Sequence, residues 1–452
     1  MTRARDVASV LTAASTLSTD TETAAVANAT VSSAMSAHHT AANGHVGRGT
    51  TANRPGSPSN GDLYFDTTVN TLIIYNGTSW ISLIPLPNPP TSVSATQTNS
   101  TVASISFTPP TTGPTVNSYI VTSSPGNITA SGSSSPISVT GLTNGTTYTF
   151  TVASVNDNGV GTSSSPSAPV TLGPPEVSGG SLTSDATYYY RTFTSSSSLT
   201  VSKGPVTMDI LRIAGGGAGG GGASQYYAAG GGGAGGYVYT TGQSMSPTSY
   251  TVTVGGGGAS DAASGTNSNI TGGSLSLTAA VGGGGGGNSG GYGVAGGSSG
   301  GSTHGLVATQ PSVSGQGNAG GPGNGYAGAG GGGAGGAGGT SNSPTGGLGG
   351  AGLNTWSSWA TVTGTGVSGF YAGGGGGGHS TYYGTPSPLN NGGSGGGGRG
   401  ASSAGASGTA GTANTGSGGG GGGANGSASV GNSANGGSGI VIVRYTRSQV
   451  GG

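Results

Sequence analysis

The feature that most constrains this chain is a glycine-rich stretch enclosed by two apolar strands, from Leu211 to Arg444. One apolar run at 210–213 opens the stretch, and a second at 440–443 closes it. Between them lie repeated glycine runs, which hold most of the chain's 106 glycines. The runs occupy residues 219–222, 230–233, 255–258, 282–287, 330–333, 373–378, 395–398 and 418–423.

Such a stretch has two interpretations. It is either a flexible glycine/serine linker or a lattice of polyglycine II helices, which have three residues per turn and no internal hydrogen bonds. In that lattice every N–H and C=O points outward, and only glycine leaves room for a neighbouring backbone. We favour the lattice, because no Asp or Glu follows Asp261, aromatic clusters interrupt the runs, and apolar strands bracket them.

The composition excludes several classes of function. Charged residues make up 4% of the chain and the formal net charge is zero, so the clustered basic surface of a nucleic-acid-binding protein is missing. There is no cysteine, which excludes disulfides and thiolate metal sites. No apolar run is long enough to cross a membrane. We see no signal peptide, which fits a protein assembled in the cytoplasm and released by lysis.

The sequence of residues 1–45 predicts a helix through which the chain attaches to a larger assembly or forms oligomers. Apolar and small residues alternate three and four apart over 5–40, as in the seam of a coiled coil. A helix that becomes ordered only on docking to a larger assembly is the alternative, and both stay open. His38, His39 and His45 have no Cys or carboxylate among them, so we expect no metal site. The seam positions are Val10, Leu17, Asn28, Val31 and Met35.

Residues 46–85 predict a linker, rich in Gly, Asn, Arg and Pro up to residue 60, followed by a small β-hairpin module. Asn76-Gly77 is a strong hairpin signal. We expect Trp80 in the core of the module. The motifs RPGSP at 54–58, GDLYFDTT at 61–68 and YNGTSW at 75–80 resemble a short module of bacteriophage tail fibres. The resemblance implies a connector between virion-proximal and distal parts.

Residues 86–173 resemble a fibronectin type III domain. The resemblance rests on PPTSV at 89–93, ISFTPP at 105–110, SYIV at 118–121 and GLTNGTTY at 141–148. Phe107 stands where the family usually has Trp, and Tyr148 occupies the position of the tyrosine corner. The resemblance implies a seven-stranded sandwich, which we expect to act as a spacer, since fold alone gives no function.

Residues 174–452 carry framing phrases around the glycine runs. VTMDILRIAGGG at 206–217, SYTVTVG at 249–255 and GSGIVIVRY at 437–445 resemble the glycine-rich domain of phage tail fibres and adhesins, over about 178–446. In those adhesins polyglycine II helices form a sandwich whose distal loops bind the host surface. The interior differs too much for any binding residue to be carried over.

Residues that could catalyse a reaction are scarce. A G-x-G-x-x-G match at 215–220 lacks the following helix and acidic residue of a dinucleotide site. Glycoside hydrolysis needs two facing carboxylates, and from residue 186 to residue 452 the only carboxylate side chains are Asp209 and Asp261. A triad using His304 or His379 with Asp261 has no nucleophile elbow to support it. We predict no enzyme activity and no cofactor.

The loops between the glycine runs remain as the candidate binding site, because glycine has no side chain to bind with. Trp and Tyr offer flat apolar faces with a polar edge, which suit stacking on sugars. We expect Tyr250, Tyr371 and Tyr326 to be structural. Of the candidates we expect Trp356, Trp359, His379, Tyr382 and Tyr383 to be exposed. The full candidate set is Trp356, Trp359, His379, Tyr382, Tyr383, Tyr226, Tyr227, Tyr292 and His304.

The sequence therefore predicts a modular, mainly β phage tail fibre protein of the virion. Its N-terminus would bind other virion tail proteins, and its glycine-rich part would bind a bacterial surface receptor, a glycan in our interpretation. Resemblance to other fibres implies a homotrimer. A structural or decorating virion protein without a receptor is the main alternative. A bacterial surface protein is another, although it would need a secretion signal.

Overall fold

The computed structural model of the protein describes residues 46–68, 71–83, 86–221, 226–259, 261–288, 290–306, 310–381, 390–403, 405–424 and 431–452. This part of the chain is mainly β, as predicted. It divides into two compact units, one made largely of the residues up to 171 and the other largely of those from 172 onward. The predicted seam residues Val10, Leu17, Asn28, Val31 and Met35 lie outside the described residues.

The first sheet follows the hairpin prediction and adds a strand. It has the order β1 (Val46–Gly49), β2 (Leu63–Asp66), β3 (Thr71–Tyr75), β4 (Trp80–Ser82). The interpretation of 46–49 as linker is wrong, because β1 pairs in parallel with β2. The Tyr64 ring lies so close to β1 that a Cβ at Gly47 would be 2.5 Å from its Cδ2. Because glycine has no Cβ, β1 can pair with β2 beneath this ring.

The next part of the chain is a β-sandwich. One sheet has the order β5 (Thr91–Asn99), β6 (Val102–Thr108), β9 (Ile137–Val139). The other has the order β11 (Gly159–Ser163), β10 (Thr147–Asn156), β7 (Ser118–Ser124), β8 (Thr129–Gly132), and β12 (Val170–Thr171) pairs with β10. Phe107 is buried, with its ring centroid 4.7 Å from that of Tyr119.

Two further sheets frame the glycine runs. One has the order β13 (Glu176–Ser178), β16 (Ser197–Ser202), β19 (Thr248–Thr253), β20 (Asn269–Thr271). The other has the order β14 (Ser181–Ser184), β15 (Tyr188–Phe193), β21 (Ile440–Thr446), β17 (Val206–Ile213), β18 (Tyr237–Met245). The described C-terminal turn η3 (Arg447–Val450) follows β21. Alternating apolar side chains from both sheets form one shared core, in which each buried Leu, Ile or Val stabilises the fold by about 1.5–3 kcal/mol.

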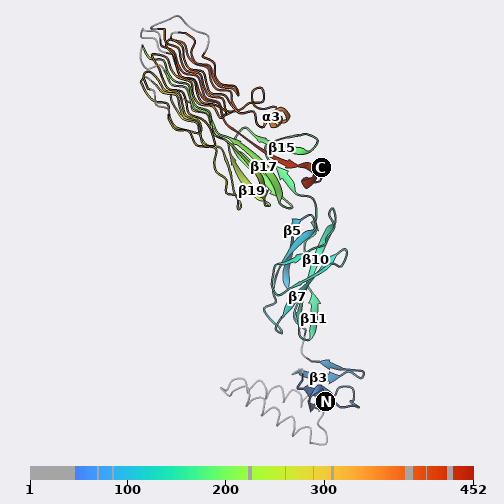
Figure 1. Cartoon of the computed structure of the whole chain (residues 1–452). Coiled ribbons are helices and arrows are strands. Elements are labelled where there is room, and N and C mark those ends of the chain that lie inside the picture. Colours follow the sequence, from blue (N-terminus) through green and yellow to red (C-terminus); the bar gives the residue numbers. More distant parts are fainter. Residues whose placement is uncertain are drawn as a thin grey trace, which may run out of the picture. The chain divides into compact units, whose positions relative to one another are not determined.

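The two apolar strands that bracket the glycine runs lie side by side. β21 pairs antiparallel with β17, and Ile213 is directly opposite Ile440. The chain therefore leaves β17 at residue 213 and reaches its partner β21 only at residue 440, after all the glycine runs, and β18 returns to the same sheet in between. Figure 1 shows the intervening segments next to one another, extending away from β17 and β19, with the helix α3 (Ser357–Thr363) beside β15.

The glycine segments are held by backbone hydrogen bonds that repeat every third residue. The N–H groups of Gly215 and Ala218 donate to Thr266 and Ala263, those of Gly216 and Gly219 to Gly437 and Ala434, and those of Gly217 and Gly220 to Gly233 and Gly230, at 2.8–3.0 Å. Successive residues of this segment thus bond to three different neighbouring segments, which satisfies their donors without a β-ladder.

These segments leave no room for side chains. A Cβ at Gly217 would lie 2.2 Å from the carbonyl oxygen of Gly284, and one at Gly231 would lie 2.1 Å from that of Gly375. Real Cβ atoms do not approach backbone oxygens this closely, so an added methyl group would push two segments apart and break their hydrogen bonds. Close packing, and not an unusual backbone φ, therefore requires glycine at these positions.

We predict a large difference between alanine substitutions at two adjacent glycines. A Cβ at Gly257 would lie 2.0 Å from the Gly436 carbonyl oxygen, whereas at Gly256 its nearest neighbour is Thr266 Oγ1 at 3.8 Å. Gly257→Ala should therefore cost about 1–3 kcal/mol of unfolding free energy, and Gly256→Ala should be neutral or stabilise by about 0.4–1 kcal/mol. Denaturant unfolding followed by circular dichroism measures both; equal effects would refute the close packing.

Candidate functional site

The turns between glycine segments gather aromatic rings at the end remote from the framing sheets. The segment after β17 and the segment before β18 run antiparallel, with Gly217 bonded to Gly233 and Gly220 bonded to Gly230. Their connection therefore lies away from the sheet and carries Tyr226 and Tyr227.

Three turns far apart in the sequence meet at this end. The N–H of Ala228 donates to the carbonyl of Tyr326 at 3.0 Å. His304 hydrogen-bonds through Nδ1 to the carbonyl oxygen of Gly325. These contacts bring Tyr226, Tyr227, His304 and Tyr326 together, and we call these four residues the tip cluster.

The rings of the tip cluster are stacked and half-buried. The Tyr227 ring lies 4.5 Å from that of His304, centroid to centroid, and 5.7 Å from that of Tyr326, with interplanar angles of 18° and 8°. The His304 and Tyr326 rings are 4.9 Å apart. The Tyr226 ring meets that of Tyr227 edge-on at 6.4 Å. The cluster thus presents several partly exposed aromatic surfaces with polar edges, fixed by the backbone behind them.

One more candidate, Tyr292, and the segment that carries Ser380 lie near this end of the glycine segments. Tyr292 is 47% exposed and follows Gly291, whose carbonyl accepts a bond from Thr303 N at 3.2 Å, next to His304. Ser380 Oγ donates to the carbonyl of Tyr226 at 3.0 Å, which joins the 380 segment to the cluster. Of the predicted candidates, the structure therefore brings together Tyr226, Tyr227 and His304, with Tyr292 beside them. Tyr326, which the sequence analysis expects to be structural, stacks on these rings and is half-buried.

The prediction that Trp359 is exposed is wrong. Trp359 lies in α3 and is fully buried, with its ring centroid 5.7 Å from that of Tyr190. The guanidinium carbon of Arg444 lies 4.7 Å from the centre of the Trp359 ring, and Arg444 Nη2 is 2.6 Å from Asp209 Oδ2. Because α3 contacts β14 and β15, its largest ring fills the apolar face of that sheet.

Trp356 lies beside Trp359, next to the same framing sheet. It is half-buried, and its ring lies 4.2 Å from that of Tyr239 in β18. Both tryptophans are thus at the sheet end of the glycine segments, while the tip cluster is at the other end. Tyr371 and Tyr250 are buried, as predicted.

His379 is also buried, against the prediction that it is exposed. It has no accessible surface, and neither ring nitrogen has a hydrogen-bond partner in the described part of the chain. Its backbone N–H and C=O bond to Ala401 and Ala424, which draws the side chain into the packed segments. Burial lowers the pKa of His379 below its ordinary value of 6.5. Tyr382 and Tyr383 lie outside the described residues.

The charged side chains near the framing sheet form ion pairs and hydrogen bonds within the fold. Asp209 pairs with Arg444; burial works to raise the pKa of Asp209, but hydrogen bonds from Arg444, Thr241 and the Gly242 N–H hold it below its usual value. Burial lowers the pKa of the guanidinium of Arg212, which has 1% of its surface exposed, to about 10. Arg212 donates through Nη1 to the Thr278 carbonyl at 2.5 Å.

The second carboxylate of the glycine-rich region is also engaged. Asp261 accepts bonds from the Gly221 N–H and from Asn288 Nδ2. Within the described ranges, no group of three or more His, Cys, Asp or Glu could hold a metal ion. Among the described residues, we also find no helix of the length and hydropathy needed to span a membrane.

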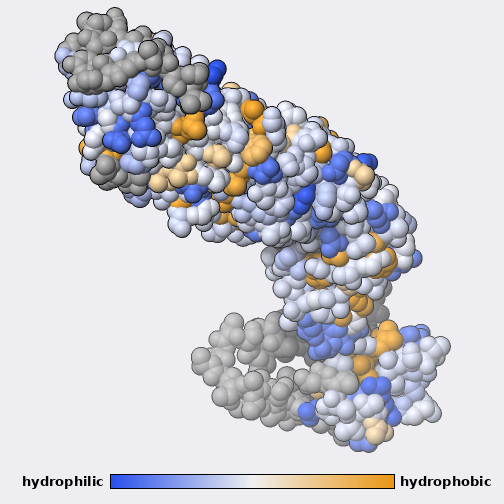
Figure 2. Space-filling model, turned by 45° about the horizontal axis from the view of Figure 1, so that its top comes forward, coloured by the Kyte–Doolittle hydropathy of each residue, from blue (hydrophilic) through white to orange (hydrophobic). Residues whose placement is uncertain are grey.

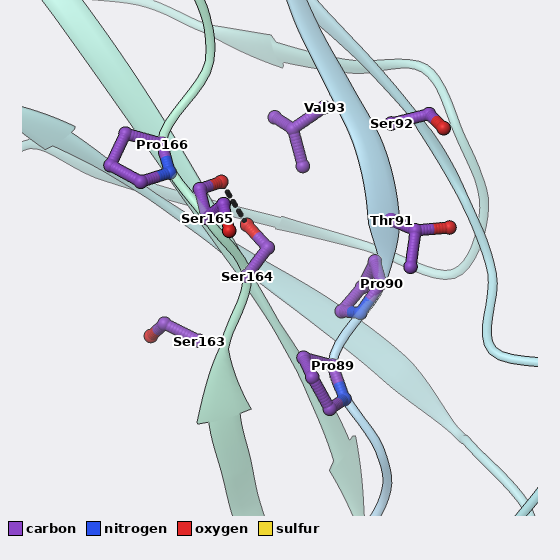
Figure 3. A pocket seen from close by; sticks show the side chains of 9 residues that line it. All are labelled: Pro89, Pro90, Thr91, Ser92, Val93, Ser163, Ser164, Ser165 and Pro166. Atoms are coloured by element: carbon purple, nitrogen blue, oxygen red, sulfur yellow. Dashed lines mark hydrogen bonds between the residues drawn. The ribbon is translucent and has the colours of Figure 1, made fainter.

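Two pockets bear on binding. One, of about 440 Å³, lies on the sandwich and is lined by Pro, Ser, Thr and Val (Figure 3), with Ser164 Oγ donating to the Ser165 carbonyl at 2.9 Å. It contains no charged side chain.

The other pocket, of about 240 Å³, includes Asn390 and Arg399, residues that the sequence interpretation did not single out. The available signal was that Arg399 is the only Lys or Arg between Arg212 and Arg444.

The surface agrees with the low charge of the sequence. The face drawn in Figure 2 is mostly pale to moderately hydrophilic, with scattered hydrophobic residues. Such a surface, rich in Gly, Ser, Thr and Asn, has few fixed charges with which to bind a partner. Binding specificity must then come from the few aromatic and charged side chains placed at turns.

Comparison with known proteins identifies two parts of the chain. Residues 191–446 match the family described as glycine-rich domain, and residues 88–170 match the fibronectin type III domain, which confirms both predicted domain types. No curated protein matches the chain.

Solved structures match only a small part of the chain. A titin domain fragment is 21% identical, with 23% of this chain and 40% of that chain covered and a TM-score of 0.19. The twitchin kinase region of C. elegans is 23% identical, with 20% and 17% covered and a TM-score of 0.18. A fourth fibronectin type III domain from human is 26% identical, with 20% and 81% covered and a TM-score of 0.18. The chain thus spans less than half of the titin and twitchin chains.

We predict that the two tryptophans near α3 differ in their effect on stability. Trp359→Ala should lower the unfolding free energy by about 3–5 kcal/mol, because it leaves a cavity under α3. Trp356→Ala should cost less, because that ring is only half-buried. Denaturant unfolding followed by circular dichroism gives both values, and a Trp359→Ala protein as stable as the wild type would contradict the observed packing.

We predict that acid weakens the fold through His379. Since the folded-state pKa lies below 6.5, the unfolded chain takes up a proton first as the pH falls. Stability should be unaffected above pH 6.5 and should decline below it, towards the folded-state pKa. His379→Phe, which cannot titrate, should remove this part of the decline in thermal midpoint between neutral and mildly acidic pH. An identical decline in the variant would exclude His379 as its source.

Proposed function

The chain belongs to the glycine-rich domain family, and on that premise we propose that its glycine segments are polyglycine II helices that carry a receptor-binding end. The threefold repeat of the hydrogen bonds supports the helix type, because polyglycine II has three residues per turn and directs its backbone groups outward. The small distances between glycine positions and neighbouring carbonyls support it as well, since only glycine packs that closely.

We propose further that the protein is a phage tail fibre protein of the virion and binds a bacterial surface receptor through the tip cluster. In this proposal the N-terminal segment attaches the fibre to other tail proteins and forms a homotrimer. The hairpin module and the sandwich act as spacers. A glycan is the receptor class that we favour, because stacked tyrosine rings with polar edges suit the apolar faces of sugar rings.

One observation carries this proposal. Turns that are far apart in the sequence bring Tyr226, Tyr227, His304 and Tyr326 to one end of the glycine segments, and leave them half-buried. A core would bury such rings completely, as it buries Trp359 and Tyr371. Partly exposed, pre-stacked rings lose little conformational freedom on binding, which favours affinity.

Binding without catalysis is the chemistry that these residues support. The two carboxylates within residues 191–446 are each engaged, Asp209 by Arg444 and Asp261 by Gly221 and Asn288. Neither faces a second carboxylate as glycoside hydrolysis requires. We therefore propose an adhesin and not a depolymerase.

The test uses labelled full-length protein and a panel of bacterial strains, with bound label measured by flow cytometry. We expect the wild type to coat at least one strain. Tyr227→Ala and Tyr292→Ala should reduce coating roughly tenfold or more, as for central aromatic contacts in other interfaces. Tyr75→Ala in the hairpin module, which also removes a partly buried tyrosine, should coat as the wild type does.

Two results would count against the proposal. If a folded wild-type protein coats no strain, the alternative of a structural or decorating virion protein is favoured. If the tip variants coat as well as the wild type, the receptor binds elsewhere on the chain. Circular dichroism of each variant separates loss of binding from loss of fold.

A further inference from the structure

The smaller pocket of the glycine-rich part has the composition of a binding site for an anion. It is lined by Asn390, Arg399, Gly400, Ser402, Ser407 and Thr409 and has a volume of about 240 Å³. Pockets for drug-sized ligands are larger, roughly 300–1,000 Å³. The pocket is therefore of a size for one small group, such as a single sugar unit, rather than for a long chain.

Arg399 brings the only positive charge of this region to the pocket. No other Lys or Arg occurs between Arg212 and Arg444. The side chain is exposed, and its Nε donates to Asn391 Oδ1 at 3.0 Å, which orients the guanidinium. Within the described ranges, Arg399 has no carboxylate partner, so its two Nη groups remain available for a ligand. A guanidinium held in this way can bind a carboxylate or phosphate with two parallel hydrogen bonds.

The hydroxyl groups of the pocket are arranged as donors. Thr409 Oγ1 accepts the Arg399 backbone N–H at 2.7 Å, and Ser407 Oγ accepts the Asn432 backbone N–H at 3.2 Å. Each oxygen is thus engaged as an acceptor, which leaves its O–H free to donate. With the guanidinium, these hydroxyls make the pocket rich in donors, as an anionic group requires.

Asn390 supplies a buried acceptor that has no partner. Its side-chain amide nitrogen donates to the Ala401 carbonyl at 2.5 Å, which identifies the other terminal atom as the oxygen. Asn390 is 2% exposed, and in the described part of the chain its Oδ1 has no hydrogen-bond partner. Because Oδ1 is itself enclosed, Asn390 forms a fixed polar wall of the pocket and is not itself a contact for the ligand.

We propose that this pocket binds the acidic group of a surface sugar, with Arg399 and the hydroxyls holding the anion. The inference rests on the proposed function and narrows its ligand to an anionic glycan. Ala401 accepts the backbone N–H of His379, and Ser380 donates to Tyr226. Hydrogen bonds therefore link the segments that carry the pocket to those that carry the tip cluster.

The test titrates full-length protein with glucuronate, glucose 6-phosphate and glucose, and measures binding by calorimetry or ligand-observed NMR. We expect the anionic sugars to bind and neutral glucose not to bind, and the affinity to fall with added salt. The two anionic probes distinguish a carboxylate ligand from a phosphate ligand. Arg399→Gln should weaken binding roughly tenfold or more. Arg399→Lys keeps the charge but not the paired N–H donors of the guanidinium, so its affinity should lie between those of the wild type and Arg399→Gln.

The matched control is Arg48→Gln, which removes an exposed arginine outside the glycine-rich part and should bind as the wild type does. The inference is overturned if glucose binds as well as glucuronate, if neither anion binds, or if Arg399→Gln binds both unchanged. These outcomes are separate from failure of the adhesin proposal. Wild-type protein that coats bacteria without binding either anion would leave that proposal intact and overturn this one.

Discussion

Backbone hydrogen bonds between glycine segments are the interaction on which the larger part of this protein depends. Each segment donates in turn to three neighbours, and the spacing allows no Cβ at most contact points. The glycine segments are therefore held mainly by peptide groups, with a few buried polar side chains such as Ser298 and Ser417 among them. The large apolar side chains stabilise the framing sheets.

That division explains how much of the fold was predictable. The alternating apolar residues of 206–213 and 440–443 identified the framing strands, and β17 and β21 pair as neighbours. The fibronectin type III sandwich followed from its turn and strand motifs. β1 was missed because Val46–Gly49 has the composition of a linker, and it is a strand through its backbone pairing with β2, with the Tyr64 ring packed against its glycines.

The binding residues were predicted less well, for a physical reason. The residue types of Trp359 and His379 suit contact with a ligand, but whether these side chains are exposed depends on which segments surround them. Glycine runs of similar composition give no information about their neighbours, so the sequence could not place Trp359 over β15 or His379 between Ala401 and Ala424. Tyr226, Tyr227 and His304 were among the candidates because they lie between glycine runs, but only the structure shows that they come together and stack with Tyr326.

The position of β21 has a consequence for synthesis of the protein. This strand lies between β15 and β17, so a central place in the sheet stays empty until residues 440–446 have left the ribosome. The glycine segments, with no side-chain core of their own, have no finished sheet to anchor them before then. A nascent chain thus carries the whole stretch between residues 213 and 440 in incomplete structure, and folding of this part is coupled to translation of its last strand.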